Sequence, residues 1–141
     1  MIIVSEGKQV GTIYHFTDDE SFWNIINDEG LKSSYFNFIS FTRSFSNPKG
    51  SHLEYMNVRF SFDGDKLSNK FKIEPYSENG YNEQEERIMW KQNKILKCFF
   101  ALKRIDILKK SEIKKFSPLE ILEFSKVKLP IYFVDKFKPV R

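Results

Sequence analysis

Cysteine is nearly absent from this sequence, since Cys98 is the single one among 141 residues. One cysteine cannot form an internal disulfide, so nothing argues for an oxidising compartment, and we expect a cytoplasmic protein. Histidine is almost as scarce, and neither His15 nor His52 has a second histidine or cysteine at a metal-ligand spacing. We therefore expect no zinc site and no metal, although carboxylates alone leave a magnesium site open.

Long apolar runs and glycine-rich nucleotide motifs are also missing. No apolar stretch approaches the roughly 20 residues needed to span a bilayer, and residues 1–10 are too short and polar for a signal peptide. We therefore expect a soluble protein with no membrane partner. The chain has no G-x-G-x-x-G, no P-loop and no G-x-S-x-G turn. Any nucleotide must therefore bind through residues other than a glycine-rich loop. The sequence also gives no support for hydrolysis by a Ser-His-Asp triad.

What the sequence does contain is typical of one globular domain. Aromatic residues make up 16% and charged residues 30% of the chain, and no linker interrupts residues 1–141. The net charge is +4, with lysines recurring from Lys91 onward and an acidic stretch at 76–86. The C-terminal third presents either a basic face for an acidic partner such as nucleic acid, or an ordinary solvated lysine surface.

The N-terminal pattern predicts a short strand followed by a helix. Residues 11–14 are β-prone, and Thr17 with Glu20 makes a capping box at the start of a helix over about 18–28. Gly30 stands where a left-handed C-cap belongs.

Further along, the chain reads as short strands with one more helix. Residues 38–42 form a strand, and residues 56–62 alternate as a strand with one buried face, closed by a turn at 63–65. Without regular βαβ alternation, this predicts an α+β fold with a mainly antiparallel sheet rather than a Rossmann domain. The remaining expectations are strands at 71–73, 95–108 (one or two) and 130–134, a strand or short helix at 85–90, a helix at 117–125 and a frayed tail at 136–141.

Three local groups of residues can carry chemistry. The first is residues 14–17, Tyr-His-Phe-Thr, where a histidine ring and a hydroxyl reach a polar ligand from a strand end. The second is residues 40–44, Ser-Phe-Thr-Arg-Ser, whose arginine can fork onto a phosphate. Taken singly, a structural histidine and an ordinary edge strand with a surface arginine are the more common explanations of these two groups.

The third group is an acidic cluster at residues 82–88 that contains Gln84, Glu85 and Glu86. Clustered carboxylates repel one another, which can hold a proton on one of them or prepare the site to stabilise a developing cation. A solvated turn is the alternative interpretation.

Taken in order, the three groups resemble the motif order of the ADP-ribosyltransferase superfamily. The nearest pattern is that of the DarT-type toxins and small phage-encoded relatives, whose arginine lies in a strand-end motif and whose glutamate closes a Gln-x-Glu. The resemblance covers about residues 13–90, and residues 91–141 carry no motif of this kind. It implies a split antiparallel β-sandwich with a few short helices. It also implies transfer of ADP-ribose from NAD to a macromolecular acceptor. A basic enzyme is consistent with a nucleic-acid or a protein acceptor, and we slightly favour protein.

The resemblance also implies residue roles. Glu86 would be the catalytic carboxylate, with Gln84 orienting the acceptor and Arg43 gripping the NAD phosphates or orienting the nicotinamide ribose. Glu83-x-Glu85 is the other possible register of the acidic motif, and Gln84-x-Glu86 is preferred because the apolar run begins after Glu86. The residues implied to contact NAD are Tyr14, His15, Phe16, Thr17, Tyr35, Phe36, Ser40, Thr42, Arg43 and Ser44, with Tyr35 or Phe36 stacking on nicotinamide.

As a phage-encoded or toxin-type effector, such a transferase would act on host machinery in the host cytoplasm. Other functions stay open at this point. A non-enzymatic protein that uses a basic, aromatic-rich surface to bind a host protein or single-stranded nucleic acid is the main alternative. NAD hydrolysis and removal of a 2′-phosphate from RNA rank lower.

Overall fold

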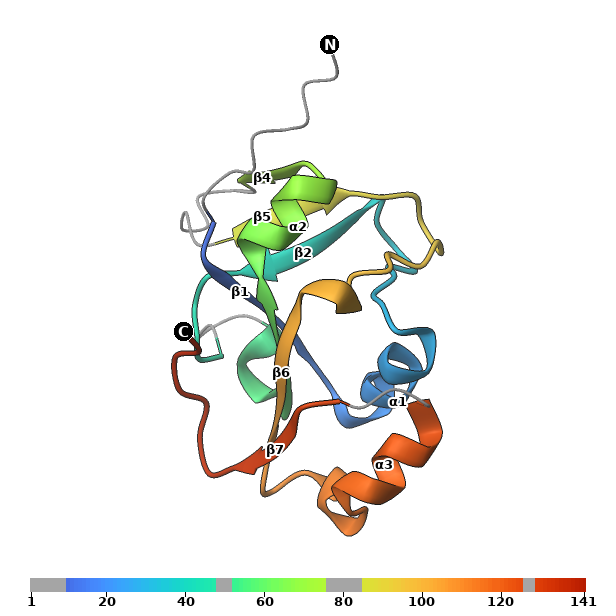
Figure 1. Cartoon of the computed structure of the whole chain (residues 1–141), viewed down its shortest axis with the longest axis vertical. Coiled ribbons are helices and arrows are strands. Elements are labelled where there is room, and N and C mark those ends of the chain that lie inside the picture. The colour runs from blue at the N-terminus through green and yellow to red at the C-terminus, as the bar shows by residue number, and fades with distance from the viewer. Residues whose placement is uncertain (1–9, 48–51, 76–84, 126–128) are drawn as a thin grey trace.

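The described chain folds as α+β, around one mixed sheet of seven strands (Figure 1). The computed structural model describes residues 10–47, 52–75, 85–125 and 129–141. The strand order is β4-β5-β2-β1-β3-β6-β7, and neighbouring strands are antiparallel except for the parallel pair β6–β7. The α+β expectation is therefore confirmed.

The strands are β1 (Thr12–Thr17), β2 (Phe38–Thr42), β3 (Val58–Asp63), β4 (Ile73–Pro75), β5 (Glu85–Met89), β6 (Leu102–Leu108) and β7 (Ile131–Val134). The helices are α1 (Asp19–Asp28), α2 (Gly64–Lys70) and α3 (Pro118–Ser125), with short 3-10 turns at His52–Tyr55, Phe99–Ala101 and Glu112–Lys115. None of these helices is long and apolar enough to cross a membrane.

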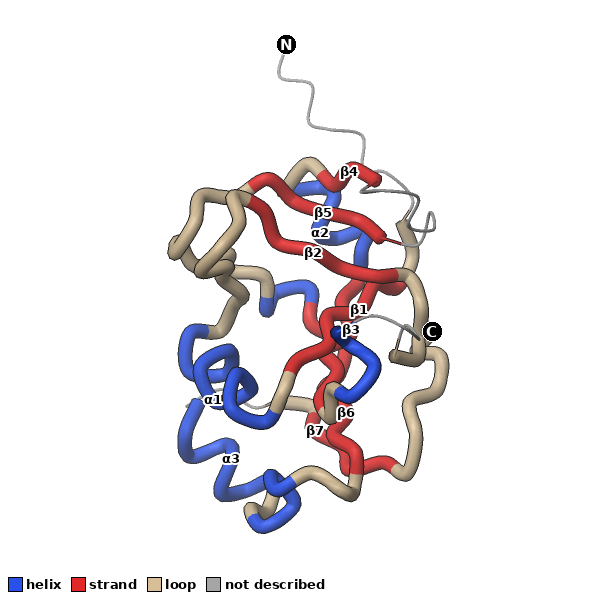
Figure 2. Tube along the Cα trace, turned by 180° about the vertical axis from the view of Figure 1, so that it is seen from behind, coloured by secondary structure: helices blue, strands red, loops and turns tan. Residues whose placement is uncertain are grey.

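The sheet divides where β1 meets β2. β1 pairs with β3 along its whole length, from Thr12↔Asp63 to Thr17↔Val58. It pairs with β2 at one position, Tyr14↔Thr42. Strands β4, β5 and β2 therefore form one part, which we call the β2 half, and β1, β3, β6 and β7 form the β3 half. Figure 2 shows the strands of the β2 half running across the direction of those in the β3 half.

Helix α1 is where it was expected, but both of its caps differ from the prediction. Asp18 is the N-cap, and its carboxylate accepts a hydrogen bond from the Ser21 amide at 2.7 Å. Thr17 cannot take this role because it still belongs to β1. The left-handed C-cap is Glu29, with φ of 52°. Gly30 serves close packing instead, since a Cβ there would stand 2.2 Å from the Leu96 carbonyl oxygen.

β3 is buried on both faces, whereas the alternation at 56–62 predicted one buried face. Val58, Phe60 and Phe62 belong to the main core, and Arg59 and Ser61 on the opposite face are buried as well. That second face is covered by a segment from the far end of the chain, which a local pattern cannot reveal. Nor is the predicted turn at 63–65 a simple turn: the Asp63 carboxylate accepts hydrogen bonds from two amides and caps α2.

The covering segment is residues 135–141, here called the C-terminal segment, and it is not frayed as expected. Phe137 is buried against Phe16, with ring centroids 5.4 Å apart. The Val140 amide donates to the Tyr14 hydroxyl at 3.0 Å. In Figure 1 the segment leaves β7 and returns along the sheet toward β1. Two aromatic side chains of β1 therefore gain a packing partner from the C-terminal segment.

The other local expectations are confirmed in outline. Residues 85–89 form a strand, and within 95–108 there is one strand, preceded by a 3-10 turn. The predicted strands at 71–73 and 130–134 are seen at 73–75 and 131–134. Ser117 and Glu120 form a reciprocal capping box, with the Glu120 amide 3.2 Å from Ser117 Oγ and the Ser117 amide 3.3 Å from Glu120 Oε1.

Candidate active site

The three groups singled out in the sequence lie on three neighbouring strands at the split of the sheet. Residues 14–17 are in β1, residues 40–42 are in β2, and Glu85 and Glu86 begin β5. Register sets Glu86 opposite Phe41 and Glu85 opposite Thr42, while Thr42 itself pairs with Tyr14 of β1. Residues far apart in the sequence are thus assembled at one place. Gln84 lies outside the described residues.

Glu86 is a buried carboxylate beside a partly exposed arginine. Its Oε1 lies 3.7 Å from Nε of Arg43, and the side chains are 3% and 46% exposed, respectively. Directly opposed residues of antiparallel strands share a face, so Glu86 lies on the same face as Phe41, among apolar neighbours such as Ile88. Away from water a charge is weakly screened. A negative charge here acts strongly on any cation that forms close by.

His15 is oriented by β2. Its Nδ1 lies 2.9 Å from the Ser40 carbonyl oxygen. A carbonyl only accepts, so Nδ1 carries the hydrogen and Nε2 keeps a free lone pair when the ring is neutral. Burial lowers the pKa of His15, and the hydrogen bond to Ser40 offsets part of that effect. The ring is therefore neutral at neutral pH, and Nε2 can accept a hydrogen bond from a ligand hydroxyl.

The hydroxyl-bearing face at this junction encloses a cavity of about 20 Å³. Its wall comes from all three strands and from Leu53, and includes Tyr14, Ser40, Thr42 and Glu85. This is room for about one water molecule, whereas small-molecule sites measure roughly 300–1,000 Å³. A nucleotide therefore does not fit inside this cavity.

Several residues implied to contact NAD also make contacts within the protein. The hydroxyl of Tyr14 accepts a hydrogen bond from Val140, Phe16 packs on Phe137, and Thr17 is buried at the end of β1. The Ser44 amide donates to Thr42 Oγ1 at 3.1 Å, which shapes the turn after β2. These contacts orient the strand ends.

Tyr35 and Phe36 are not brought to the junction. They are 86% and 58% exposed and precede β2, whereas Arg43 follows it. The four steps from Phe38 to Thr42 span about 13 Å of extended chain, and Phe36 stacks on Phe38 with centroids 5.0 Å apart. The predicted stacking of either ring on a nicotinamide held at Glu86 is therefore not supported by this arrangement.

A buried ionic cluster on the β3 half was missed from the sequence. Asp106 accepts from Nη2 of Arg59 at 2.7 Å through one oxygen, and from Arg104 at 2.7 and 3.0 Å through the other. Arg59 lies between the rings of Tyr14 and Phe137, 4.8 and 5.0 Å from their centroids. The available signal was the Arg-Ile-Asp-Ile sequence at 104–107, which places one carboxylate within an apolar strand.

Two other chemistries find no support. Burial raises the pKa of the Cys98 thiol to about 12, so it is not a thiolate nucleophile at neutral pH. Among the described residues, no three His, Cys, Asp or Glu side chains come close enough together to hold a metal ion. Comparison of the sequence with models of known protein families and with curated proteins gives no match.

Proposed function

We propose that this protein transfers ADP-ribose from NAD to a macromolecular acceptor, with Glu86 as the catalytic carboxylate. The observation that carries the proposal is the buried Glu86 carboxylate 3.7 Å from Arg43, at the junction of β1, β2 and β5. The motif order of the sequence and the single β1–β2 pairing position support it as well, because a split antiparallel sandwich is the fold that the resemblance implies.

The chemistry suits a fixed carboxylate. The bond between the ribose anomeric carbon and the nicotinamide nitrogen breaks, and nicotinamide leaves with the electron pair. The sugar then carries positive charge, which Glu86 stabilises. An acceptor nucleophile attacks the anomeric carbon and loses its proton. Removing one such preorganised electrostatic partner typically costs 10²–10³-fold in kcat.

The neighbouring groups take binding roles in this proposal. Arg43 is partly exposed beside Glu86, and it is the residue that would contact the NAD phosphates. Nε2 of His15 accepts from a ribose hydroxyl, since Nδ1 is engaged by Ser40. The role of Gln84 in orienting the acceptor stays a prediction. We favour a protein acceptor slightly over nucleic acid, and an effector that acts on host machinery.

Labelled NAD and a cell lysate test the proposal, with and without nuclease. We expect label on a macromolecule with the wild type, at least a hundredfold less with Glu86→Gln, and a reduction with Arg43→Gln. Glu112→Gln is the matched control, because Glu112 is exposed, pairs with Lys115 and lies in the 3-10 turn Glu112–Lys115, outside β1, β2 and β5. Glu85→Gln tests the other register of the acidic motif. Unchanged labelling in both Glu86→Gln and Arg43→Gln would refute the proposal.

The exposed aromatic side chains favour one second candidate. Tyr35 and Phe36 are accessible, and Arg87 lies over the ring of Phe38, 5.6 Å from its centroid. Aromatic rings next to cations are typical of surfaces that stack unpaired bases or bind acidic proteins. A non-enzymatic binding protein would show salt-sensitive binding that survives Glu86→Gln but falls with Tyr35→Ser and Phe36→Ser together.

A further inference from the structure

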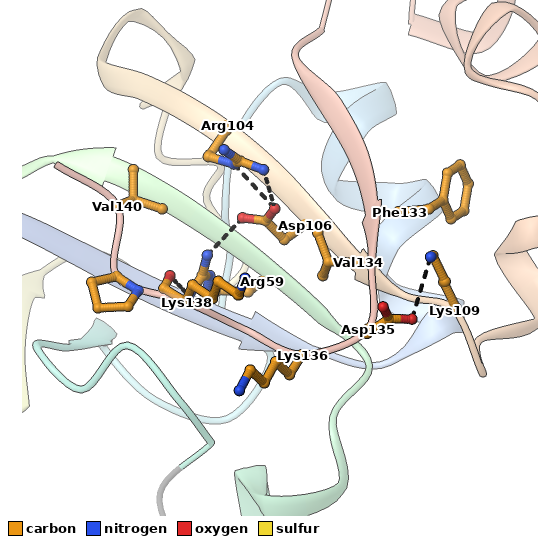
Figure 3. A pocket seen from close by; sticks show the side chains of 11 residues that line it. Arg59, Arg104, Asp106, Lys109, Phe133, Val134, Asp135, Lys136, Lys138 and Val140 are labelled. Carbon is orange, nitrogen blue, oxygen red and sulfur yellow. Dashed lines mark hydrogen bonds and ion pairs between the residues drawn. The ribbon is translucent and has the colours of Figure 1, made fainter.

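A second concave site lies on the β3 half, away from Glu86. It is a pocket of about 580 Å³ between β6, the end of β7 and the C-terminal segment (Figure 3). In the sheet it is separated from β5 by β2, β1 and β3. Its volume falls within the roughly 300–1,000 Å³ typical of small-molecule sites. This is large enough for a ligand of nucleotide size, unlike the cavity at the split.

Arg104 is held in place at this pocket. Its Nε and Nη2 donate to one oxygen of Asp106 at 3.0 and 2.7 Å, and its guanidinium lies 4.0 Å from the centroid of the Tyr132 ring. These bonds use two of its five N–H groups, and no other described residue accepts from them. The side chain is still 33% exposed. An arginine fixed from two sides loses little freedom when it binds a ligand.

The charges that line the pocket do not cancel. Arg59, Arg104 and Asp106 together carry +1, since one carboxylate serves two guanidinium groups. Lys109 and Asp135 pair at 3.3 Å and cancel. Lys136 and Lys138 add two more positive charges, and neither ammonium group pairs with a carboxylate of the described residues. The lining therefore has a net charge of +3, which favours an anion.

The uncharged part of the lining is apolar. Phe133, Val134, Pro139 and Val140 lie along the same pocket, and Figure 3 shows Val140 and Phe133 on opposite sides of the charged groups. Sites for organic phosphates combine cations that bind the phosphate with apolar surface for the remainder of the molecule. An inorganic ion would not contact these apolar side chains, whereas the organic part of a phosphate ester can.

We propose that this pocket binds a small organic phosphate, with Arg104, Lys136 and Lys138 as the groups that contact the phosphate oxygens. Arg59 and Asp106 position Arg104 and do not touch the ligand. The proposal is independent of ADP-ribose transfer, because none of its residues belongs to the junction of β1, β2 and β5.

The test is isothermal titration of the purified full chain with ADP, and competition by inorganic pyrophosphate. We expect saturable binding by the wild type and at least tenfold weaker binding by the double variant Lys136→Gln, Lys138→Gln. The matched control is Lys32→Gln, Lys72→Gln, which removes the same charge from exposed lysines elsewhere and should change the dissociation constant less than twofold. Thermal unfolding checks that both double variants fold.

Three results would overturn the proposal. One is no saturable binding at millimolar ADP. Another is equal weakening in the two double variants, since this would indicate a general charge effect. The third is loss of ADP binding in Arg43→Gln but not in Lys136→Gln, Lys138→Gln, because this would assign the phosphate to the junction instead. Loss of NAD turnover in Glu86→Gln bears on the proposed function alone.

Discussion

Glu86 and Asp106 are both acidic residues buried in strands beside arginine, and they differ in how the arginine is used. Asp106 accepts three hydrogen bonds of 2.7 to 3.0 Å from two guanidinium groups. The ion pair of Glu86 with Arg43 spans 3.7 Å, and Arg43 is half exposed. The three short hydrogen bonds of Asp106 fix both of its arginine partners within the fold. The ion pair of Glu86 is longer, and its arginine is partly open to solvent, where a ligand can reach it.

The largest effect is expected at Asp106. Asp106→Asn removes the negative charge between Arg59 and Arg104 and leaves Arg59 buried without its ionic partner. We expect the free energy of unfolding to fall by about 3–5 kcal/mol, as when one partner of a buried pair is lost. Urea denaturation measures this. A decrease in the free energy of unfolding of less than about 1 kcal/mol would show that the Asp106 carboxylate does not stabilise the fold.

Phe137→Ala should destabilise the β3 half by about 3 kcal/mol. The ring is buried against Phe16 and covers the guanidinium group of Arg59, and truncating a buried phenylalanine usually costs this much or more. The same denaturation experiment measures it, with the neighbouring exposed Lys136→Ala as the control. Equal free energies of unfolding for the two variants would mean that packing of the C-terminal segment through Phe137 does not stabilise the sheet.

Glu86→Gln should change stability much less than Asp106→Asn. The substitution keeps the shape of the side chain and removes a 3.7 Å ion pair with an arginine that is partly exposed, so we expect a loss under about 1.5 kcal/mol. We measure ADP-ribose transfer and urea denaturation on the same sample, and expect Glu86→Gln to lose activity with little loss of stability. A loss comparable to that of Asp106→Asn would place Glu86 among the structural carboxylates.

The smallest effect is a pH dependence from His15. Its pKa is lowered in the folded state because burial disfavours the imidazolium. The unfolded chain therefore binds this proton more readily, and stability present above about pH 6.5 is lost as the pH falls from there through the folded-state pKa. Unfolding free energies between pH 7.5 and 5.5 should fall less steeply for His15→Gln than for the wild type. Parallel profiles would contradict the burial of this ring.

Sequence patterns predicted what depends on near neighbours. The helix at 18–28, the strand at 38–42 and the Ser117–Glu120 capping box follow from local spacing. Of the predicted site, the structure brings Arg43 to Glu86 and ties His15 to the backbone of β2, because β2 lies between β1 and β5 in the sheet.

The sequence could not show contacts between residues that are far apart in the chain. Arg59 looks like an exposed residue in an alternating strand, and its burial depends on Phe137, 78 positions later, and on the carbonyl oxygen of Lys138 at 2.7 Å. Gly30 looks like a helix cap until the approach of Leu96 is known. Tyr35 and Phe36 are near Arg43 in sequence, yet the extended strand between them keeps them apart.

The contact between Tyr14 and Val140 joins positions 126 residues apart, and this has a consequence for the timing of folding. β1 is synthesised early, but the covering of its second face needs residues 137–140. Closing such a long loop is slow because its entropic cost precedes any gain from the contact. On the ribosome, this face of the sheet therefore stays uncovered until translation has passed residue 140, and Tyr14 and Phe16 are among the apolar side chains that a chaperone would meet during that interval.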